Sequence, residues 1–200
     1  MPRPPRSEYP GAWHHVMNRG ACRQDVFLDR WDRRAFLAEL AETVERHEIE
    51  VHSYVLMGNH YHLLVRTPDP SLGQAMQYLA GRYTQRFNTK HGRDGALFRG
   101  RYKAIVIESD RYLLGCSRYI HRNPLEIGAQ SPGDYRWSSY PAYLRDHKPP
   151  EWLHTNFLTR MAGSAEQYEA LVESPLDTPT DEILRRSRLP TKLSGSADAA

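Results

Sequence analysis

The sequence has little cysteine and no long hydrophobic run. Its 200 residues include two cysteines, Cys22 and Cys116. These form no metal-type pair and no disulfide framework, so we expect both to be reduced thiols. No stretch approaches the ~18 apolar residues of a membrane span. The first residues, MPRPPRSEYPG, contain no apolar region of the kind that signal peptides carry. We therefore expect a cytoplasmic protein without a membrane partner.

Acidic residues are scarce in the middle of the chain. Residues 82–122 hold 10 Lys and Arg against 3 Asp and Glu, although the whole sequence has a formal net charge of only +3. Such a concentration is typical of a surface that binds a polyanion. An ordinary solvated basic face is the alternative that composition leaves open.

Hydrophobic spacing predicts alternating strands and helices. Helices are expected at 31–47 with Asp29 as N-cap, at 72–90 with Ser71 as N-cap, and at 110–122, where Pro124 stops the helix. Strands are expected at 12–20, 49–56, 60–66 and 101–108, with Gly58-Asn59 as the turn of a hairpin. Strict alternation would place Ile49, Val51, Ser53 and Val55 on one strand face.

This order predicts an α+β fold of the ferredoxin-like or RRM-like class. Right-handed crossovers give a four-stranded antiparallel sheet with two helices on one face, followed by a further C-terminal helix. We expect a domain at 8–147, with the aromatic run 135–144 packed on it. An appendage at 148–200 is expected to form a helical hairpin at 156–172 and to be disordered from Ser174 onward.

Two histidines and a tyrosine are the side chains most able to carry chemistry. His60 and His62 leave the same face of a strand, ~7 Å apart along it, and can converge on one cation. Leu63 and Val65 then point toward the helices, so the histidines are expected on the open sheet face. A pair of unrelated surface histidines is the alternative.

Tyr119 and Asn123 share one face of the last helix, because they are four residues apart. A phenol with a pKa of ~10 is about one part in a thousand phenolate at neutral pH, so it needs nearby positive charge. Asn123 offers a carbonyl oxygen as a third metal ligand, although the following proline biases it away from the α region. Tyr119 is one of twelve tyrosines, and a packing role is the alternative. Basic neighbours that could activate it are Arg118, His121 and Arg122.

Several ordered runs resemble one known family, the REP-associated tyrosine transposases, which are single-tyrosine HUH enzymes related to insertion-sequence transposases. The runs are HVMNRG (15–20), YVLMGNHYHLLV (54–65), GALFRGRY (95–102), RYIHRNP (118–124) and, more loosely, YRWSSY (135–140). The resemblance spans roughly residues 8–145. Gly58 departs from the proline common in the family, and the middle position of the HUH triplet is the bulky Tyr61, which we expect to face the helices.

The resemblance implies a DNA endonuclease and strand transferase. It gives His60, His62 and Asn123 to a Mg²⁺ or Mn²⁺ site and makes Tyr119 the nucleophile that forms a 5′-phosphotyrosine and releases a 3′-OH. Ligand chemistry alone favours Zn²⁺ or Mn²⁺ for two imidazoles. The implied substrate is single-stranded DNA beside a hairpin, in a bacterial cytoplasm near the nucleoid. A monomer is favoured and a dimer is possible.

Basic and polar residues around these motifs are expected to bind the DNA. Phe98 and Tyr102 lie among them and could stack on bases. The alternatives are a non-catalytic RRM-like module that binds single strands and a metal-dependent phosphodiesterase that uses water. The predicted DNA-binding residues are Asn18, Arg19, Arg82, Arg86, Arg99, Arg101, Lys103 and Arg122.

Overall fold

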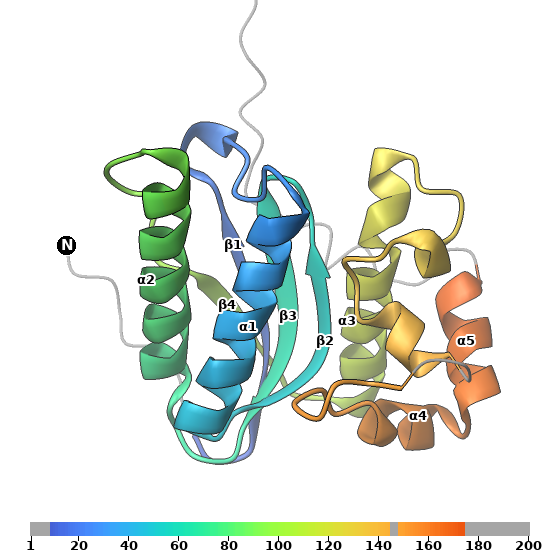
Figure 1. The fold of residues 1–200 in the computed structure, drawn as a ribbon. Helices are drawn as coiled ribbons and strands as arrows, with labels where there is room; N and C mark the ends of the chain where they lie inside the picture. The colour runs from blue at the N-terminus through green and yellow to red at the C-terminus, as the bar shows by residue number, and fades with distance from the viewer. Residues whose placement is uncertain (1–8, 145–147, 175–200) are drawn as a thin grey trace, which may run out of the picture.

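A computed structural model describes residues 9–144 and 148–174. Four antiparallel strands form a single sheet in the order β2-β3-β1-β4 (Figure 1). A hairpin joins β2 to β3, and the crossovers β1-α1-β2 and β3-α2-β4 each pass over one strand of the sheet, so the ferredoxin-like α+β fold is confirmed. The strands are β1 (Ala12–Arg19), β2 (Glu50–Leu56), β3 (His60–Thr67) and β4 (Lys103–Ile107).

Helices α1 (Arg30–His47) and α2 (Leu72–His91) pack against one face of the sheet. Asp29 begins α1 as predicted, since its carboxylate accepts from the backbone of Trp31 and Asp32 in a capping box. Ser71 occupies the N-cap position of α2, but its hydroxyl makes no capping hydrogen bond. It donates instead to the carbonyl oxygens of His47 and Asp69. The predicted N-cap position is therefore confirmed, without a capping hydrogen bond from the side chain.

The core on this helical face is aromatic. The Phe36 ring contacts the rings of Tyr61 and Tyr83, at centroid distances of 4.8 Å and 5.1 Å. Tyr61 therefore faces the helices, as predicted. Phe98 and Tyr102 belong to the same cluster and are 7% and 6% exposed. Burial places most of each ring in the core, but both residues also line a groove beside α2, so their stacking on bases stays a prediction.

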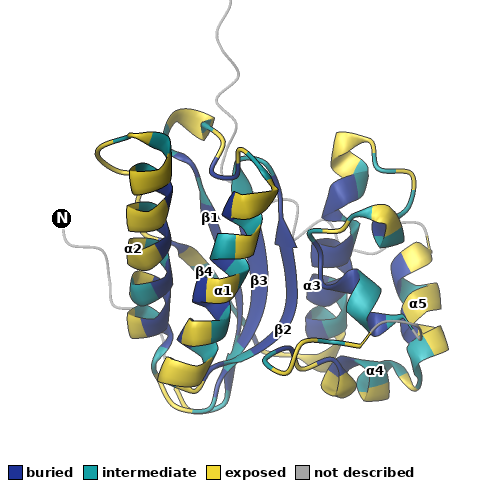
Figure 2. Ribbon diagram, in the orientation of Figure 1, coloured by how far each residue is buried: buried dark blue, intermediate teal, exposed yellow. Residues whose placement is uncertain are grey.

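The other face of the sheet is also covered. Helix α3 (Asp110–Arg122) lies across it, and α4 (Asn156–Ala162) and α5 (Ala165–Glu173) pack against α3. Figure 2 shows α3 buried over most of its length. The expectation of an open face was wrong because Val55 and Leu64 of the sheet pack with Leu113 and Ile120 of α3 in a second core. The predicted helical hairpin at 156–172 is confirmed.

A β-bulge in β2 changes which side chains meet on each face. The pairing register with β3 shifts between Val51 and Ser53, so Val51 lies opposite Val65 whereas Ser53 lies opposite Leu64. One extra residue, His52, reverses the alternation for the rest of the strand. The predicted shared face of Ile49, Val51, Ser53 and Val55 was therefore wrong.

Short 3-10 turns complete the fold: η1 (Ala21–Arg23), η2 (Asn123–Ile127), η3 (Pro132–Asp134) and η4 (Tyr140–Tyr143). Tyr140 and Tyr143 are buried, so the 135–144 run packs on the domain as expected. The predicted disorder from Ser174 onward concerns residues that, apart from Ser174, lie outside the described residues. The predicted domain boundary between residues 147 and 148 stays a prediction. Among the described helices none combines the length and apolarity needed to cross a membrane.

Candidate nuclease site

Three side chains far apart in sequence meet between the sheet and α3. The Tyr119 ring lies 5.6 Å from the ring of His62 and 5.9 Å from that of His15, edge-on to both. Pairing of β1 with β3 places His15 beside His62, and their rings stack 5.1 Å apart. The predicted convergence of the tyrosine helix on the histidine strand is thus present in the geometry, and Tyr119 is only 5% exposed.

The Nδ1 atom of each HUH histidine has a hydrogen-bond partner. Nδ1 of His60 lies 2.7 Å from Oδ1 of Asn59, and Nδ1 of His62 lies 2.9 Å from Nε2 of His15. Burial lowers the pKa of His15 to about 3, so this ring is neutral. The two HUH rings are 5.1 Å apart and nearly perpendicular.

Asn123 is buried at the end of α3 with αR backbone angles (φ −50°, ψ −37°), so the proline after it does not displace it from the helix. Its Nδ2 donates to the Tyr119 carbonyl oxygen at 3.4 Å. Its Oδ1 is consequently the side-chain atom that can coordinate a cation.

The imidazole nitrogens of His60 and His62 and the amide oxygen of Asn123 are atoms of the kinds that bind divalent metals. Histidine ligands in metal sites commonly hydrogen-bond through one ring nitrogen and coordinate through the other, and both HUH rings engage a partner through Nδ1. No group of three or more His, Cys, Asp or Glu side chains within 9–144 and 148–174 is arranged to hold a metal. A complete ligand shell would therefore combine Nε2 of His60 and His62 with Asn123 or with oxygens from the substrate.

The charged neighbours of Tyr119 in sequence face away from it. Nη2 of Arg118 donates to the backbone carbonyl of Ser174 at 2.8 Å, and Nη1 of Arg122 donates to that of Val172. Both guanidinium groups bind the C-terminal end of α5, where carbonyl oxygens lack helical partners. His121 is fully buried, and burial lowers its pKa to about 3. The expectation that His121 supplies positive charge is wrong.

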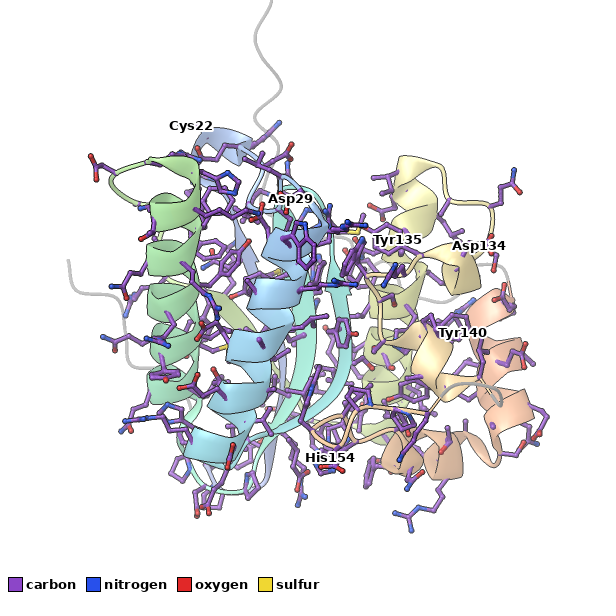
Figure 3. All side chains as sticks on the ribbon, viewed as in Figure 1. Cys22, Asp29, Asp134, Tyr135, Tyr140 and His154 are labelled. Atoms are coloured by element: carbon purple, nitrogen blue, oxygen red, sulfur yellow. The ribbon has the colours of Figure 1, made fainter. Side chains whose placement is uncertain are left out.

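His121 instead belongs to a buried network that joins α3 to its neighbours. Its Nδ1 lies 3.0 Å from the Tyr168 hydroxyl of α5, and its Nε2 lies 2.8 Å from the Ser139 hydroxyl. Tyr168 also bonds Ser117, which bonds Ser53 of β2 at 2.6 Å. This chain fixes α3 relative to the sheet and α5. Figure 3 shows the densely packed side chains between these elements, beside the labelled Tyr140.

Two predicted DNA-binding residues share the face of the histidines. Arg19 pairs with His60 in the sheet, and Lys103 and His62 both pair with Met17, so these side chains lie in cross-strand rows. Arg99 and Arg101 are exposed on the loop that precedes β4. That loop is tied to β1, since the Arg99 amide donates to the Arg19 carbonyl and Asn18 Nδ2 donates to the Gly100 carbonyl.

Arg82 and Arg86 lie on α2, on the opposite side of the sheet. Both guanidinium groups form ion pairs with Glu39 of α1, at 3.2 Å and 2.8 Å, and the Glu39 side chain is 1% exposed. The structure does not bring these two arginines to the histidines. DNA binding by them stays a prediction.

Sequence reasoning missed His15 and Asn59 as partners of the HUH histidines. His15 could have been found from topology, because the ferredoxin-like order places β1 beside β3. In the sheet His62 pairs with Met17, two residues from His15, and this register cannot be predicted from either strand alone. Asn59 was assigned only to a turn, since asparagine is common there.

Comparison with known proteins bears on the fold and on the family. No curated protein matches. A solved REP-associated tyrosine transposase bound to a REP hairpin superposes with a TM-score of 0.61 at 16% identity, covering 77% of this chain and 92% of that chain. A transposase structure from Deinococcus radiodurans gives a TM-score of 0.42 at 16% identity, covering 55% and 88%. The profile of the IS200-like transposases matches residues 9–123. This chain therefore belongs to the IS200-like transposase family.

Proposed function

We propose that this protein cuts and rejoins single-stranded DNA next to a hairpin, through a covalent bond between Tyr119 and the 5′-phosphate of the cut strand. The observation that carries the proposal is the meeting of Tyr119 of α3 with His62 of β3 and His15 of β1. Membership of the IS200-like family supports the reaction class.

The chemistry assigned to the protein is nucleophilic substitution at phosphorus. The Tyr119 oxygen bonds to phosphorus and loses its proton, while the bond from phosphorus to the 3′ oxygen breaks and that oxygen leaves as a 3′-OH after taking up a proton. A second 3′-OH can reverse the step without ATP, because the phosphotyrosine conserves the phosphodiester bond. A divalent cation held by His60, His62 and Asn123 would polarise the phosphate.

Hairpin recognition is proposed from the REP-associated relative, which was solved bound to a REP hairpin. We propose that the basic residues on the histidine face, Arg19 and Lys103, bind a strand that enters the site, which their shared face with His60 and His62 supports. We propose that Asn18, Arg99 and Arg101 contact the same DNA. Arg122 is proposed to contact it as well, although its Nη1 atom donates to the Val172 carbonyl of α5.

A groove of about 920 Å³ beside these residues offers a route for unpaired bases. It lies between α2 and the loop before β4. None of the described residues that line it is acidic, and amide side chains can pair with base edges. Its polar lining includes Asn18, Gln77, Thr84, Gln85 and Arg101.

The experiment uses the full chain, Mn²⁺ and a hairpin oligonucleotide with single-stranded flanks taken from DNA beside its own gene. With the label placed 3′ of the cut, a denaturing gel should show a labelled protein band. Tyr119→Phe should lose the band. Tyr112→Phe, which changes a half-buried tyrosine on the same helix, should keep it.

Other outcomes would replace the proposal. Cleavage without a band means that water is the nucleophile, as in a metal-dependent phosphodiesterase. Binding with neither cleavage nor a band on the correct site identifies a non-catalytic module. A band that persists in Tyr119→Phe assigns the nucleophile to another residue.

A further inference from the structure

The turn that precedes His60 is held in a tight set of hydrogen bonds. The Gly20 amide donates to the Asn59 carbonyl at 2.9 Å, and the amides of Val26 and Phe27 both donate to the Gly58 carbonyl. Residues 20–27 thus wrap around the Gly58-Asn59 turn. Apart from the short turn η1 and an isolated bridge between Gly20 and Phe98, this segment contains no helix or strand.

That segment contains unfavourable backbone conformations. Cys22 and Arg23 are consecutive non-glycine residues with φ of 49° and 60°, in the left-handed region. Figure 3 labels Cys22, in the short turn at the upper edge of the sheet. Gly20 is required beside them, because a Cβ there would lie 2.1 Å from the Gln24 carbonyl oxygen. Such strain persists where surrounding contacts over-determine it, and it is often found at functional sites.

The left-handed turn aims the Arg23 carbonyl at Asn59. Nδ2 of Asn59 donates to this oxygen at 3.2 Å. A carbonyl oxygen can only accept, so the bond fixes which end of the Asn59 amide faces Arg23. The other end, Oδ1, lies 2.7 Å from Nδ1 of His60.

The direction of the second bond follows from the first. Oδ1 can only accept, so the neutral His60 ring must carry its proton on Nδ1 to make this bond. In a neutral imidazole the other nitrogen, Nε2, then holds the lone pair. A metal ligand needs that lone pair, and ring orientation is commonly set by such a partner.

We propose that Asn59 is a positioning residue: anchored by the Arg23 carbonyl, it holds His60 in the tautomer and ring orientation in which Nε2 can coordinate a divalent cation. This rests on the proposed function. The strained turn at Cys22 and Arg23 is the device that presents the carbonyl. His62 has its own partner in His15, and the same nitrogen of that ring is engaged.

The test compares Asn59→Ala with Asn59→Asp. Alanine removes both bonds, whereas aspartate keeps an acceptor for His60 and loses the donor to Arg23. Asn88→Ala is the matched control, since Asn88 Nδ2 also donates to a loop carbonyl, that of Gly95, at 2.9 Å on another part of the chain. All variants are made in the full chain, and each is checked for folding by its thermal melting curve.

The first readout needs neither metal nor DNA. Long-range proton–nitrogen correlation spectra of ¹⁵N-histidine protein, recorded well above the usual histidine pKa of ~6.5, show which nitrogen of His60 is protonated. Wild type, Asn59→Asp and Asn88→Ala should show His60 protonated at Nδ1. Asn59→Ala should show a mixture or the Nε2-protonated form. An Nε2-protonated His60 in wild type, or an unchanged spectrum in Asn59→Ala, overturns the proposal.

The second readout is Mn²⁺ affinity, measured by electron paramagnetic resonance with the metal alone. Asn59→Ala should bind roughly 10- to 100-fold more weakly, the usual cost of losing such a partner, and Asn59→Asp should recover most of the affinity. Equal affinity in Asn59→Ala and wild type contradicts the proposal. Failure of the proposed function can be told apart from failure of this proposal. In that case wild type would form no Tyr119 adduct with DNA, while the tautomer of His60 could still be measured.

Discussion

The two faces of the sheet bury side chains of different kinds. On the α1 and α2 side the core is aromatic and aliphatic, built around Phe36, Tyr61 and Tyr83. On the α3 side buried histidines and hydroxyl groups are interspersed among the apolar residues, with His15, His62 and His121 all nearly inaccessible to solvent. One sheet thus carries a packing face and a face rich in groups that can donate, accept or coordinate.

The two faces of the sheet are expected to contribute differently to stability and to chemistry. Buried polar groups are costly unless they are hydrogen-bonded, and on the α3 side the chain Ser53–Ser117–Tyr168–His121–Ser139 provides those bonds. The apolar face contributes stability through area removed from water. We expect substitutions on the α3 face to change the reaction and the pH dependence, and those on the face covered by α1 and α2 to change the free energy of unfolding.

The largest expected effect comes from removing either of the two histidines proposed to hold the metal. His60→Ala or His62→Ala should each lower the cleavage rate roughly 10³-fold, the size of several kcal/mol of lost transition-state stabilisation. DNA binding in a gel-shift assay should change little. His91→Ala is the control, because His91 bonds Asp32 on the helical side. Wild-type cleavage that persists in EDTA would show that no metal is needed.

The histidine face should also make the protein sensitive to acid. Burial lowers the pKa of His121 to about 3, below the value of 6.5 expected when unfolded. The unfolded state therefore binds more protons between these values, so stability is complete above about pH 6.5 and falls as pH decreases toward 3. His15, with a pKa lowered to about 3, and His52, lowered to about 4, act in the same direction.

His121→Gln removes one of these titrations. Urea unfolding at about pH 7 and about pH 5 should show a smaller loss of free energy in His121→Gln than in wild type. The dependence should shrink without vanishing, because the other buried histidines remain. Equal losses in the two proteins would mean that His121 is not held neutral by burial.

The smallest expected effects compare arginines on the two sides. Arg99→Gln with Arg101→Gln should weaken binding to single strands and reduce the slope of log K against log salt by roughly 1.4, at about 0.7 per phosphate contact. Arg82→Gln with Arg86→Gln should leave the slope unchanged, because Glu39 engages both. A lower slope in the second pair would show that Arg82 and Arg86 themselves contact the DNA.

Much of this fold can be predicted from the sequence because its local signals agree. Helix 110–122 begins and ends where predicted, since Ser109 caps it and Pro124 stops its continuation. The HxH spacing and the i,i+4 pair Tyr119 and Asn123 predicted which side chains share a face. These are properties of one element at a time.

What could not be predicted depends on how elements meet. The bulge at His52 and the register of β1 against β3 come from long-range pairing, so neither the reversed alternation nor the His15–His62 contact was accessible. The hydrogen bonds of Arg118 and Arg122 could not be predicted for the same reason, because their acceptors, the carbonyls of Ser174 and Val172, lie 56 and 50 residues later in the chain. The strained turn at Cys22 has no sequence signature.

A paired measurement on Tyr119 and Tyr83 tests the division between the faces most directly. Each is changed to phenylalanine, and both adduct yield and unfolding free energy are recorded. Tyr83 donates to the Val26 carbonyl within the aromatic core, so Tyr83→Phe should lose about 1–2 kcal/mol of stability and keep the DNA adduct. Tyr119→Phe should keep its stability within about 0.5 kcal/mol and form no adduct. An adduct in Tyr119→Phe, or its loss in a folded Tyr83→Phe, would contradict the account.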